Sequence, residues 1–287
     1  MKKTSFCVCL FFLFFSAAAF VPAPTESVFL PVLMYHSVSS TGKSVYIVTE
    51  RQLENDLIYL TGHGYETVSA KQLCDYADGV GELPEKPILL TFDDGHYNNL
   101  SSALPLLKKY GCKAVVCVIG KFCEYSSTHP AESHRFYSYL TWEDVTELAS
   151  NGNVEIGSHT YAMHDYSPRF GIGRIKGEND KAYERNLRED LQRLNDKLHA
   201  CGVEPIVFAY PFGRYNSIAQ NTLLSLGFRI TLTCNEGVNK IEKGNPKSIL
   251  HLKRFNRSSV LGTEKVFSLL RPKQDSLPKG RSEKQSR

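Results

Sequence analysis

Short apolar runs and amphipathic helix patterns alternate along the chain from Phe29 to about Leu270. Runs typical of buried strands occur at Val28–Met34, Pro87–Phe92, Lys113–Ile119, Val154–Gly157, Ile206–Tyr210, Phe228–Thr233 and Ile249–Leu252. Helix patterns lie between them at Gln52–Leu60, Ser69–Tyr76, Ser101–Tyr110, Trp142–Ser150, Asp180–Gly202 and Ile218–Leu226. Repeated strand–helix units predict a parallel sheet covered by helices. About seven strands suit a barrel as well as an open sheet.

Some of these helices carry start signals in the sequence. Thr49 with Gln52, and Thr141 with Asp144, have the spacing of a capping box, in which a side chain and the backbone satisfy each other at the first turn. The helix that starts at Asp180 has leucines at steps of four, three and four, which form one apolar stripe. These signals predict well-defined starts and one long amphipathic helix.

The two ends of the chain differ from the body. Residues 1–23 have the pattern of a secretory signal peptide, because Lys2 and Lys3 precede an apolar run of about 15 residues and small residues follow. An uncleaved membrane anchor is the alternative, although the run is shorter than the ~20 residues of a spanning helix. Residues 271–287 are rich in Pro, Lys, Ser and Arg, so we expect a disordered basic tail. This tail could contact anionic envelope polymer, or it could be a solvated terminus.

Charge and cysteine content exclude some functional classes. The formal net charge is +4 over 287 residues, but the tail alone carries six basic and two acidic residues. The body therefore has no basic surplus, and nucleic-acid binding is not supported. Two of the eight cysteines lie in the predicted signal peptide, and the other six show no Cys-x-x-Cys spacing. We predict no disulfide.

The first polar cluster follows the predicted strand Pro87–Phe92. Asp93 and Asp94 come directly after this strand and precede Gly95. In β/α folds, functional residues lie at the carboxyl ends of strands. Adjacent carboxylates repel each other unless a cation is near, and one can bind a metal while the other acts as a base. The same three residues could instead form an ordinary surface turn.

Two histidines follow the predicted strand Val154–Gly157. His159 and His164 are five positions apart, so neither a helix nor a straight strand would present both on one face, whereas a loop could. Zinc in catalytic sites binds histidine nitrogen and carboxylate oxygen. Asp94, His159 and His164 are therefore a candidate set of three ligands. Either histidine alone could instead be structural.

Two further clusters also follow predicted strands. Tyr210–Gly213 contains Pro and Gly around an aromatic residue, which predicts a rigid turn whose backbone N–H groups could stabilise an oxyanion. Its aromatic rings could stack on a sugar, or they could belong to the core. His36 follows the first strand, where it could be a general acid or a structural histidine.

Together, the runs Thr91–Gly95, Ser158–Thr160 with His164, and Tyr210–Gly213 resemble the polysaccharide deacetylase family, the NodB-like carbohydrate esterases. The resemblance extends over roughly residues 31–256, with the motifs in family order. It implies an irregular (β/α) barrel of about seven parallel strands.

The resemblance also implies an activity for a catalytic domain over residues 24–270. Members of the family use one divalent metal, most often zinc, with Co²⁺, Ni²⁺ and Mn²⁺ as alternatives. The implied substrate is an N-acetylated polysaccharide of the cell wall or an exopolysaccharide, from which N-acetyl groups are removed. We therefore expect an exported enzyme, secreted or associated with the cell envelope.

Carried over to this chain, the resemblance makes Asp93 the general base and Asp94, His159 and His164 the metal ligands. The backbone N–H of Phe212 would help to hold the oxyanion. The residues expected to contact the sugar are Tyr210, Pro211 and Tyr161.

Three features depart from the common family pattern. The second histidine follows the first by five positions rather than four, as in members that act on exported poly-N-acetylglucosamine. The arginine that usually precedes the proline of the third motif is absent, and Arg254 is a candidate to replace it in space. The general acid is either His36 or His251, and the early Tyr-His motif favours His36.

Two other functions compete with the N-deacetylase hypothesis. An acetylxylan-type O-acetyl esterase would use the same metal centre, and a non-catalytic relative would only bind glycan. A pure binder needs no base beside a metal, so Asp93 favours catalysis. The absence of a Gly-x-Ser-x-Gly motif disfavours a serine hydrolase. The glycan, its length and the oligomeric state stay open, and we expect Glu124–Tyr139 to shape the rim of the cleft.

Overall fold

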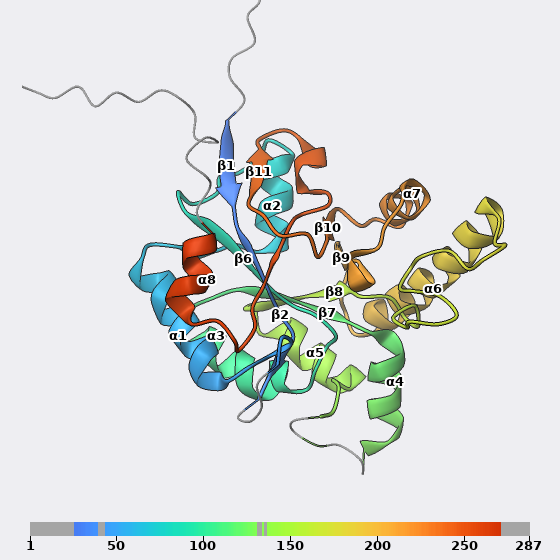
Figure 1. Cartoon of the computed structure of the whole chain (residues 1–287), viewed down its shortest axis with the longest axis horizontal. Coiled ribbons are helices and arrows are strands. Elements are labelled where there is room, and N and C mark those ends of the chain that lie inside the picture. Colours follow the sequence, from blue (N-terminus) through green and yellow to red (C-terminus); the bar gives the residue numbers. More distant parts are fainter. Residues whose placement is uncertain (1–25, 40–43, 131–133, 135–136, 271–287) are drawn as a thin grey trace, which may run out of the picture.

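A curled sheet of parallel strands forms the centre of the protein (Figure 1). The computed structural model describes residues 26–39, 44–130, 134 and 137–270. Within these residues the strand order is β10-β9-β8-β7-β6-β2-β12, and β5 also pairs with β6. The strands are β2 (Val32–Tyr35), β5 (Glu66–Thr67), β6 (Pro87–Phe92), β7 (Ala114–Val118), β8 (Val154–Ser158), β9 (Val207–Ala209), β10 (Ile230–Leu232) and β12 (Phe255–Asn256). The predicted irregular (β/α) barrel is confirmed.

Helices surround this sheet and short strand pairs lie at its margins (Figure 1). The helices are α1 (Glu50–Gly62), α2 (Ala70–Ala77), α3 (Leu104–Lys109), α4 (Gly120–Thr128), α5 (Trp142–Ser150), α6 (Asp180–Ala200), α7 (Ser217–Ser225) and α8 (Thr263–Leu269), with a π-helical turn η1 (Asn99–Ala103) and 3-10 turns η3 (Pro211–Gly213) and η4 (Pro246–Ile249). The marginal pairs are β1 (Ser27–Leu30) with β11 (Asn239–Glu242) and β3 (Ser37–Val38) with β4 (Ile47–Val48). Among the described residues, no helix has the length and apolar character that a membrane span requires. The predicted signal peptide and basic tail lie outside the described residues.

Most predicted elements are present, with differences that have local causes. Both predicted capping boxes are confirmed, at the starts of α1 and α5. The predicted strand at Ile249–Leu252 is wrong: Pro246 opens a 3-10 turn there, and His251 has a left-handed φ of 55° that interrupts an extended chain. No start signal predicts α4, because its N-cap residue, Ile119, provides no side-chain hydrogen bond.

Alternate strand residues face two different cores. Along β6, Ile88, Leu90 and Phe92 pack with residues of α1, α3 and α5 in the core outside the sheet. Leu89 instead packs with Val115 of β7 and the inward residues of the other strands. Since side chains alternate along a strand, Thr91 and then Asp93 continue the inward series that begins at Leu89. Asp93 therefore follows the strand with its side chain on the inner face of the sheet.

Residues Leu252–Asn256, here called the closing segment, connect the two edges of the sheet. Leu252 forms a parallel bridge with Leu232 of β10, and β12, at the end of the segment, pairs with β2. The backbone N–H of Arg254 donates to Asn235 O at 2.8 Å. Arg254 therefore lies between the two edge strands.

A buried ion pair anchors the chain just after the closing segment. Asp56 of α1 accepts hydrogen bonds from Arg257 Nε at 2.6 Å and Arg257 Nη2 at 3.0 Å, and from the hydroxyls of Tyr35 and Thr263. Both side chains of the pair are fully buried. Such a pair contributes to stability only while each charge keeps its partner.

We expect Arg257→Met to reduce the free energy of unfolding by about 3–5 kcal/mol, because Asp56 keeps a buried charge without its cation. Urea denaturation would measure this loss. Arg229→Met is the matched control, since the Arg229–Asp78 pair is more than one-third exposed on both sides and should contribute at most about 1 kcal/mol. Equal losses for the two variants would contradict the assignment of Asp56–Arg257 as an anchor.

Candidate metal and catalytic site

A pocket of about 510 Å³ lies at the carboxyl ends of the parallel strands. Its lining residues come from the ends of β2, β6, β8, β9, β10 and β12 and from nearby loops: Met34, His36, Tyr46, Asp93, Asp94, His159, His164, Tyr166, Tyr210, Phe212, Cys234 and Asn256. The strand ends thus bring together the Asp-Asp-Gly, His-x4-His and Tyr-Pro-Phe-Gly motifs. Parallel β/α sheets place functional side chains at this edge.

Arg254 holds the Asp93 carboxylate in a two-pronged ion pair. Arg254 Nη1 donates to Asp93 Oδ1 and Arg254 Nη2 to Asp93 Oδ2, each at 2.8 Å. The arginine also donates to Thr233 O at 2.8 Å and to the Thr91 hydroxyl at 3.2 Å. Burial alone would raise the pKa of Asp93, but the adjacent guanidinium lowers it below its ordinary value. Arg254, the candidate to replace the missing motif arginine in space, therefore pairs with Asp93 and keeps it ionised.

Asp94 turns its carboxylate away from Asp93 by a left-handed backbone. Its φ is 74°, and Gly95 follows with a φ of 73°. Asp94 Oδ1 lies 3.6 Å from Nε2 of both His159 and His164, whereas Oδ2 lies 3.6 Å from His96 Nε2. Burial would raise the pKa of Asp94, but His96 and the other nearby imidazoles hold this pKa well below its usual range. One oxygen is thus directed to the two motif histidines.

The backbone around the histidines directs their Nε2 atoms inward. His159 is buried, its N–H donates to Val118 O, and its Nδ1 lies 2.7 Å from Ala209 O. A carbonyl at Nδ1 fixes the tautomer with a free Nε2, which is the usual state of a metal-binding histidine. Burial lowers the pKa of His159 to about 4, so the ring is neutral at pH 7. Thr160, with a φ of 73°, then redirects the chain so that the loop returns His164 to the pocket.

Asp94, His159 and His164 could hold one divalent metal ion. The ligand atoms of the three lie within 4.8 Å of one another. Two ligands about 2.1 Å from one tetrahedral zinc ion lie roughly 3.4 Å apart, close to the 3.6 Å between Asp94 Oδ1 and each histidine Nε2. One carboxylate and two imidazoles also form the ligand chemistry of catalytic zinc sites. The residues therefore fit the metal that the sequence motifs imply.

The two candidate acids occupy different positions. His36 lines the pocket, and its ring lies edge-on to Tyr46 with centroids 4.9 Å apart. Burial lowers the pKa of His36, although Asp93 and Asp94 oppose this shift. His251 instead stacks on Tyr215 at 4.4 Å and is not among the residues that line the pocket.

Of the predicted sugar contacts, Tyr210 lines the pocket, and the predicted oxyanion donor, Phe212, lines it as well. The Tyr210 side chain is nevertheless fully buried, and its hydroxyl donates to Gln220 Oε1. Phe212 has a left-handed φ of 54° and lies in the first turn of η3, where a backbone N–H has no acceptor within the helix.

The other two predicted contacts lie away from the lining. Pro211 is buried at the start of η3. The Tyr161 side chain is also buried, packs against Gly120 and has the Arg193 guanidinium 3.8 Å from its ring centroid. It is not among the residues that line the pocket.

Several residues of the site were not predicted from the sequence. His96 was detectable, because it directly follows the Asp-Asp-Gly run, but nothing in its spacing indicates that it contacts Asp94. Tyr46 and Tyr166 lie in irregular segments without a motif, and Cys234 lies just beyond β10. All six cysteines among the described residues are free thiols.

The sequence matches a known protein family over the residues that form this site. A family model described as polysaccharide deacetylase matches residues 80–231, which include both aspartates, both histidines and the Tyr-Pro-Phe-Gly turn. The chain belongs to the polysaccharide deacetylase family. Arg254 and the whole closing segment lie beyond the matched residues.

Individual relatives agree with this family. The polysaccharide deacetylase YxkH of Bacillus subtilis strain 168 is 30% identical over 215 residues, covering 75% of this chain and 68% of the relative. The poly-β-1,6-N-acetyl-D-glucosamine N-deacetylase of Escherichia coli K12 is 26% identical over 228 residues, 72% of this chain but 34% of that longer protein. The structure of IcaB from Ammonifex degensii matches with a TM-score of 0.66 and 26% identity, covering 84% of this chain and 96% of that chain.

We expect wild-type protein to bind one Zn²⁺ per chain and His164→Ala to lose most of this affinity, because one of three protein ligands is removed. Isothermal titration with zinc, after dialysis against a chelator, would measure both values. His199→Ala is the matched control, since this histidine is exposed on α6. Unchanged zinc binding by His164→Ala would contradict the ligand assignment.

Proposed function

We propose that this polysaccharide deacetylase removes N-acetyl groups from an N-acetylglucosamine-containing glycan in a metal-dependent reaction. The observation that carries the proposal is one pocket in which Asp93, held ionised by Arg254, lies next to the Asp94–His159–His164 cluster. Two relatives support the substrate, because they are named for deacetylation of poly-β-1,6-N-acetyl-D-glucosamine.

Asp93 acts as the general base in this proposal. An ionised carboxylate has four lone-pair positions, and Arg254 uses one on each oxygen. A further lone pair on each oxygen stays available to accept the proton of an attacking water. The fixed guanidinium also orients the carboxylate, so the base meets the water in one geometry.

Asp94, His159 and His164 bind the metal in this proposal. When bound, a divalent ion polarises the acetyl carbonyl and lowers the pKa of a water molecule. The contact between His159 Nδ1 and Ala209 O holds the imidazole in the tautomer that leaves Nε2 free. His96, beside Asp94 Oδ2, holds the carboxylate so that Oδ1 faces both histidines.

The rest of the pocket serves the acetyl group and the leaving amine. The Phe212 N–H donates to the carbonyl oxygen as negative charge develops there. His36 lines the same pocket as Asp93, and the Asp93 and Asp94 carboxylates favour its protonated form against burial. This imidazolium donates a proton to the departing nitrogen. The water oxygen, deprotonated by Asp93, bonds to the acetyl carbon, the C–N bond then breaks, and acetate and a free amine leave. Tyr210 remains our proposal for a sugar contact.

We also propose that the protein is exported. Residues 1–23 carry the charge and apolar pattern of a signal peptide. An N-acetylated polymer of the cell envelope would then be within its reach.

Wild-type protein loaded with zinc should release acetate from β-1,6-linked N-acetylglucosamine oligomers. Asp93→Asn should bind zinc as wild type does but lose at least about 100-fold in kcat, because it removes the proton acceptor and keeps the metal ligands. Acetate release would be followed with a coupled assay. Asp196→Asn, which alters an exposed carboxylate of α6, should match wild type.

The outcomes distinguish the competing functions. A fully active Asp93→Asn would refute the assignment of the base. Acetate release from O-acetylated xylan but not from the amide oligomers would make the protein an ester hydrolase. Zinc-loaded protein that binds the oligomers but releases no acetate would make it a glycan-binding member of the family.

Variants of the two candidate acids should separate their roles. His36→Ala should reduce kcat by about 10²–10⁴-fold, because general acid catalysis contributes this much. His251→Ala should cost less than about tenfold, since this ring only packs against Tyr215 and Tyr210. Steady-state kinetics at equal zinc content would compare them. A larger loss for His251→Ala would exchange the two assignments.

A further inference from the structure

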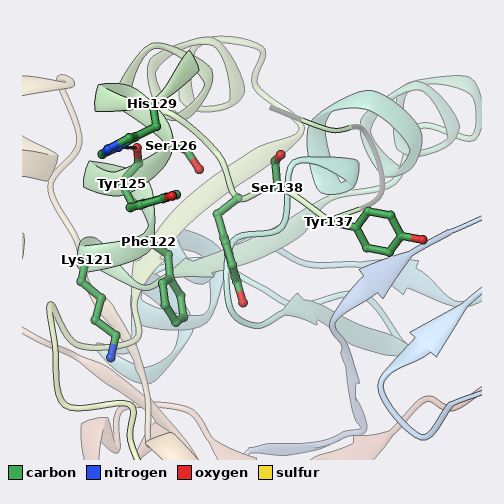
Figure 2. A pocket seen from close by; sticks show the side chains of 8 residues that line it. Lys121, Phe122, Tyr125, Ser126, His129, Tyr137 and Ser138 are labelled. Atoms are coloured by element: carbon green, nitrogen blue, oxygen red, sulfur yellow. Dashed lines mark hydrogen bonds between the residues drawn. The ribbon is translucent and has the colours of Figure 1, made fainter. Parts of the chain in front are cut away.

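A second hollow of about 520 Å³ lies beside the metal site, between α4 and residues 137–139, which precede α5. Figure 2 shows Lys121, Phe122 and Tyr125 of α4 and His129, which follows the helix, along one side, with Ser138 on the other. This volume is in the range of small-molecule sites, about 300–1,000 Å³. Nothing in the proposed reaction uses this hollow.

Aromatic rings make up most of its wall. Phe122 stacks on Tyr139 with ring centroids 4.3 Å apart, and Tyr125 stacks on His129 at the same separation. Tyr125 is 53% exposed although tyrosine is a large ring. The negative face of an aromatic ring attracts the polarised C–H groups on one face of a pyranose. The serine hydroxyl groups at the margin are suited to sugar hydroxyls.

Tyr139 connects the hollow directly to the metal site. Its ring stacks on His96 at 4.9 Å, and the two residues also form a backbone bridge. His96 Nε2 lies 3.6 Å from Asp94 Oδ2. One side chain therefore separates the aromatic wall from a proposed metal ligand.

A second connection runs along the other margin. Lys121, at the start of α4, pairs with Asp165 at 2.6 Å. Asp165 directly follows His164, so the ion pair ties α4 to the loop that carries a proposed metal ligand. Contacts at both margins thus link the wall of the hollow to residues of the metal site, and the hollow lies next to the reaction pocket.

We infer that this hollow binds a second sugar unit of the same glycan chain whose reacting unit lies at Asp93. The occupant is a pyranose ring stacked on the Phe122–Tyr125 face of α4, covalently linked to the sugar in the reaction pocket. The enzyme therefore prefers chains over single sugars. This inference rests on the proposed function, because it requires a glycan of which one unit reaches Asp93.

Binding can be measured without turnover in the Asp93→Asn background. Isothermal titration with β-1,6-linked N-acetylglucosamine disaccharide and pentasaccharide would give the gain in affinity from chain length. Tyr125→Ala should weaken pentasaccharide binding by about three- to tenfold, and more than disaccharide binding, because a stacking ring is lost. Tyr125→Phe keeps the ring and should keep the gain.

Leu224→Ala is the control for truncation of an exposed side chain, since Leu224 is 46% exposed on α7. In the Asp93→Asn background, it should bind the pentasaccharide as tightly as Asp93→Asn alone, which is the parent for these comparisons. The inference is overturned if the parent binds both oligomers equally, or if Tyr125→Ala keeps the full gain from chain length. Neither result would touch the proposed function, because acetate release from the same oligomers tests it separately. Conversely, chain-dependent binding without acetate release by the zinc-loaded protein would sustain the subsite and refute the reaction.

Discussion

Two adjacent carboxylates directly follow one buried strand, and both must stay ionised although burial favours their neutral forms. The rest of the site depends on this constraint. Asp93 and Asp94 follow β6 without a spacer, and burial raises the pKa of each. Arg254 opposes this for Asp93, and His96 with the neighbouring imidazoles opposes it for Asp94. The two acids thus have separate partners, and the left-handed backbone of Asp94 sends their side chains in different directions. This separation gives the two neighbouring acids distinct roles in the proposed reaction.

The partner of Asp93 depends on how the barrel closes. Arg254 lies in a segment that contacts both edge strands, so its position is fixed by the sheet rather than by a flexible loop. Its guanidinium donates to Thr233 O and Thr91 as well as to Asp93, and these bonds leave it little freedom to turn. The ion pair Asp56–Arg257 then anchors the chain three residues further on. The segment that closes the barrel therefore also orients the carboxylate that we propose as the base.

Features that depend on local sequence patterns could be predicted from the sequence, whereas most contacts between residues of different segments could not. The β6 strand was predicted at its observed bounds, and both capping boxes were found, because strand hydrophobicity and helix-start chemistry are written within a few residues. The meeting of Asp94, His159 and His164 was also foreseen, since strand-end position is a property of parallel sheets. The contact of His96 with Asp94 was not, nor was the position of Tyr161, because each depends on backbone turns that no spacing reveals. Helix α4 escaped prediction for lack of a capping residue, and with it the aromatic wall beside the site.

The buried pair of Asp93 and Arg254 also bears on whether the site is catalytic. Replacing a buried ion pair with well-packed apolar residues is often neutral or stabilising, so stability alone gives little reason to keep one. Here the pair lies on the inner face of the sheet. Leu89, four residues before Asp93 on the same face, shows that an apolar side chain packs well on this face. A binding protein could fill that position with such a residue. The Asp93 carboxylate is ionised, faces the cluster of candidate metal ligands and keeps a free lone pair on each oxygen. Burying such a charge costs free energy without benefit in a protein that only binds glycan, whereas a general base requires it. The charge at this position therefore argues for hydrolysis more strongly than the metal-binding residues do, since those would serve a binder as well.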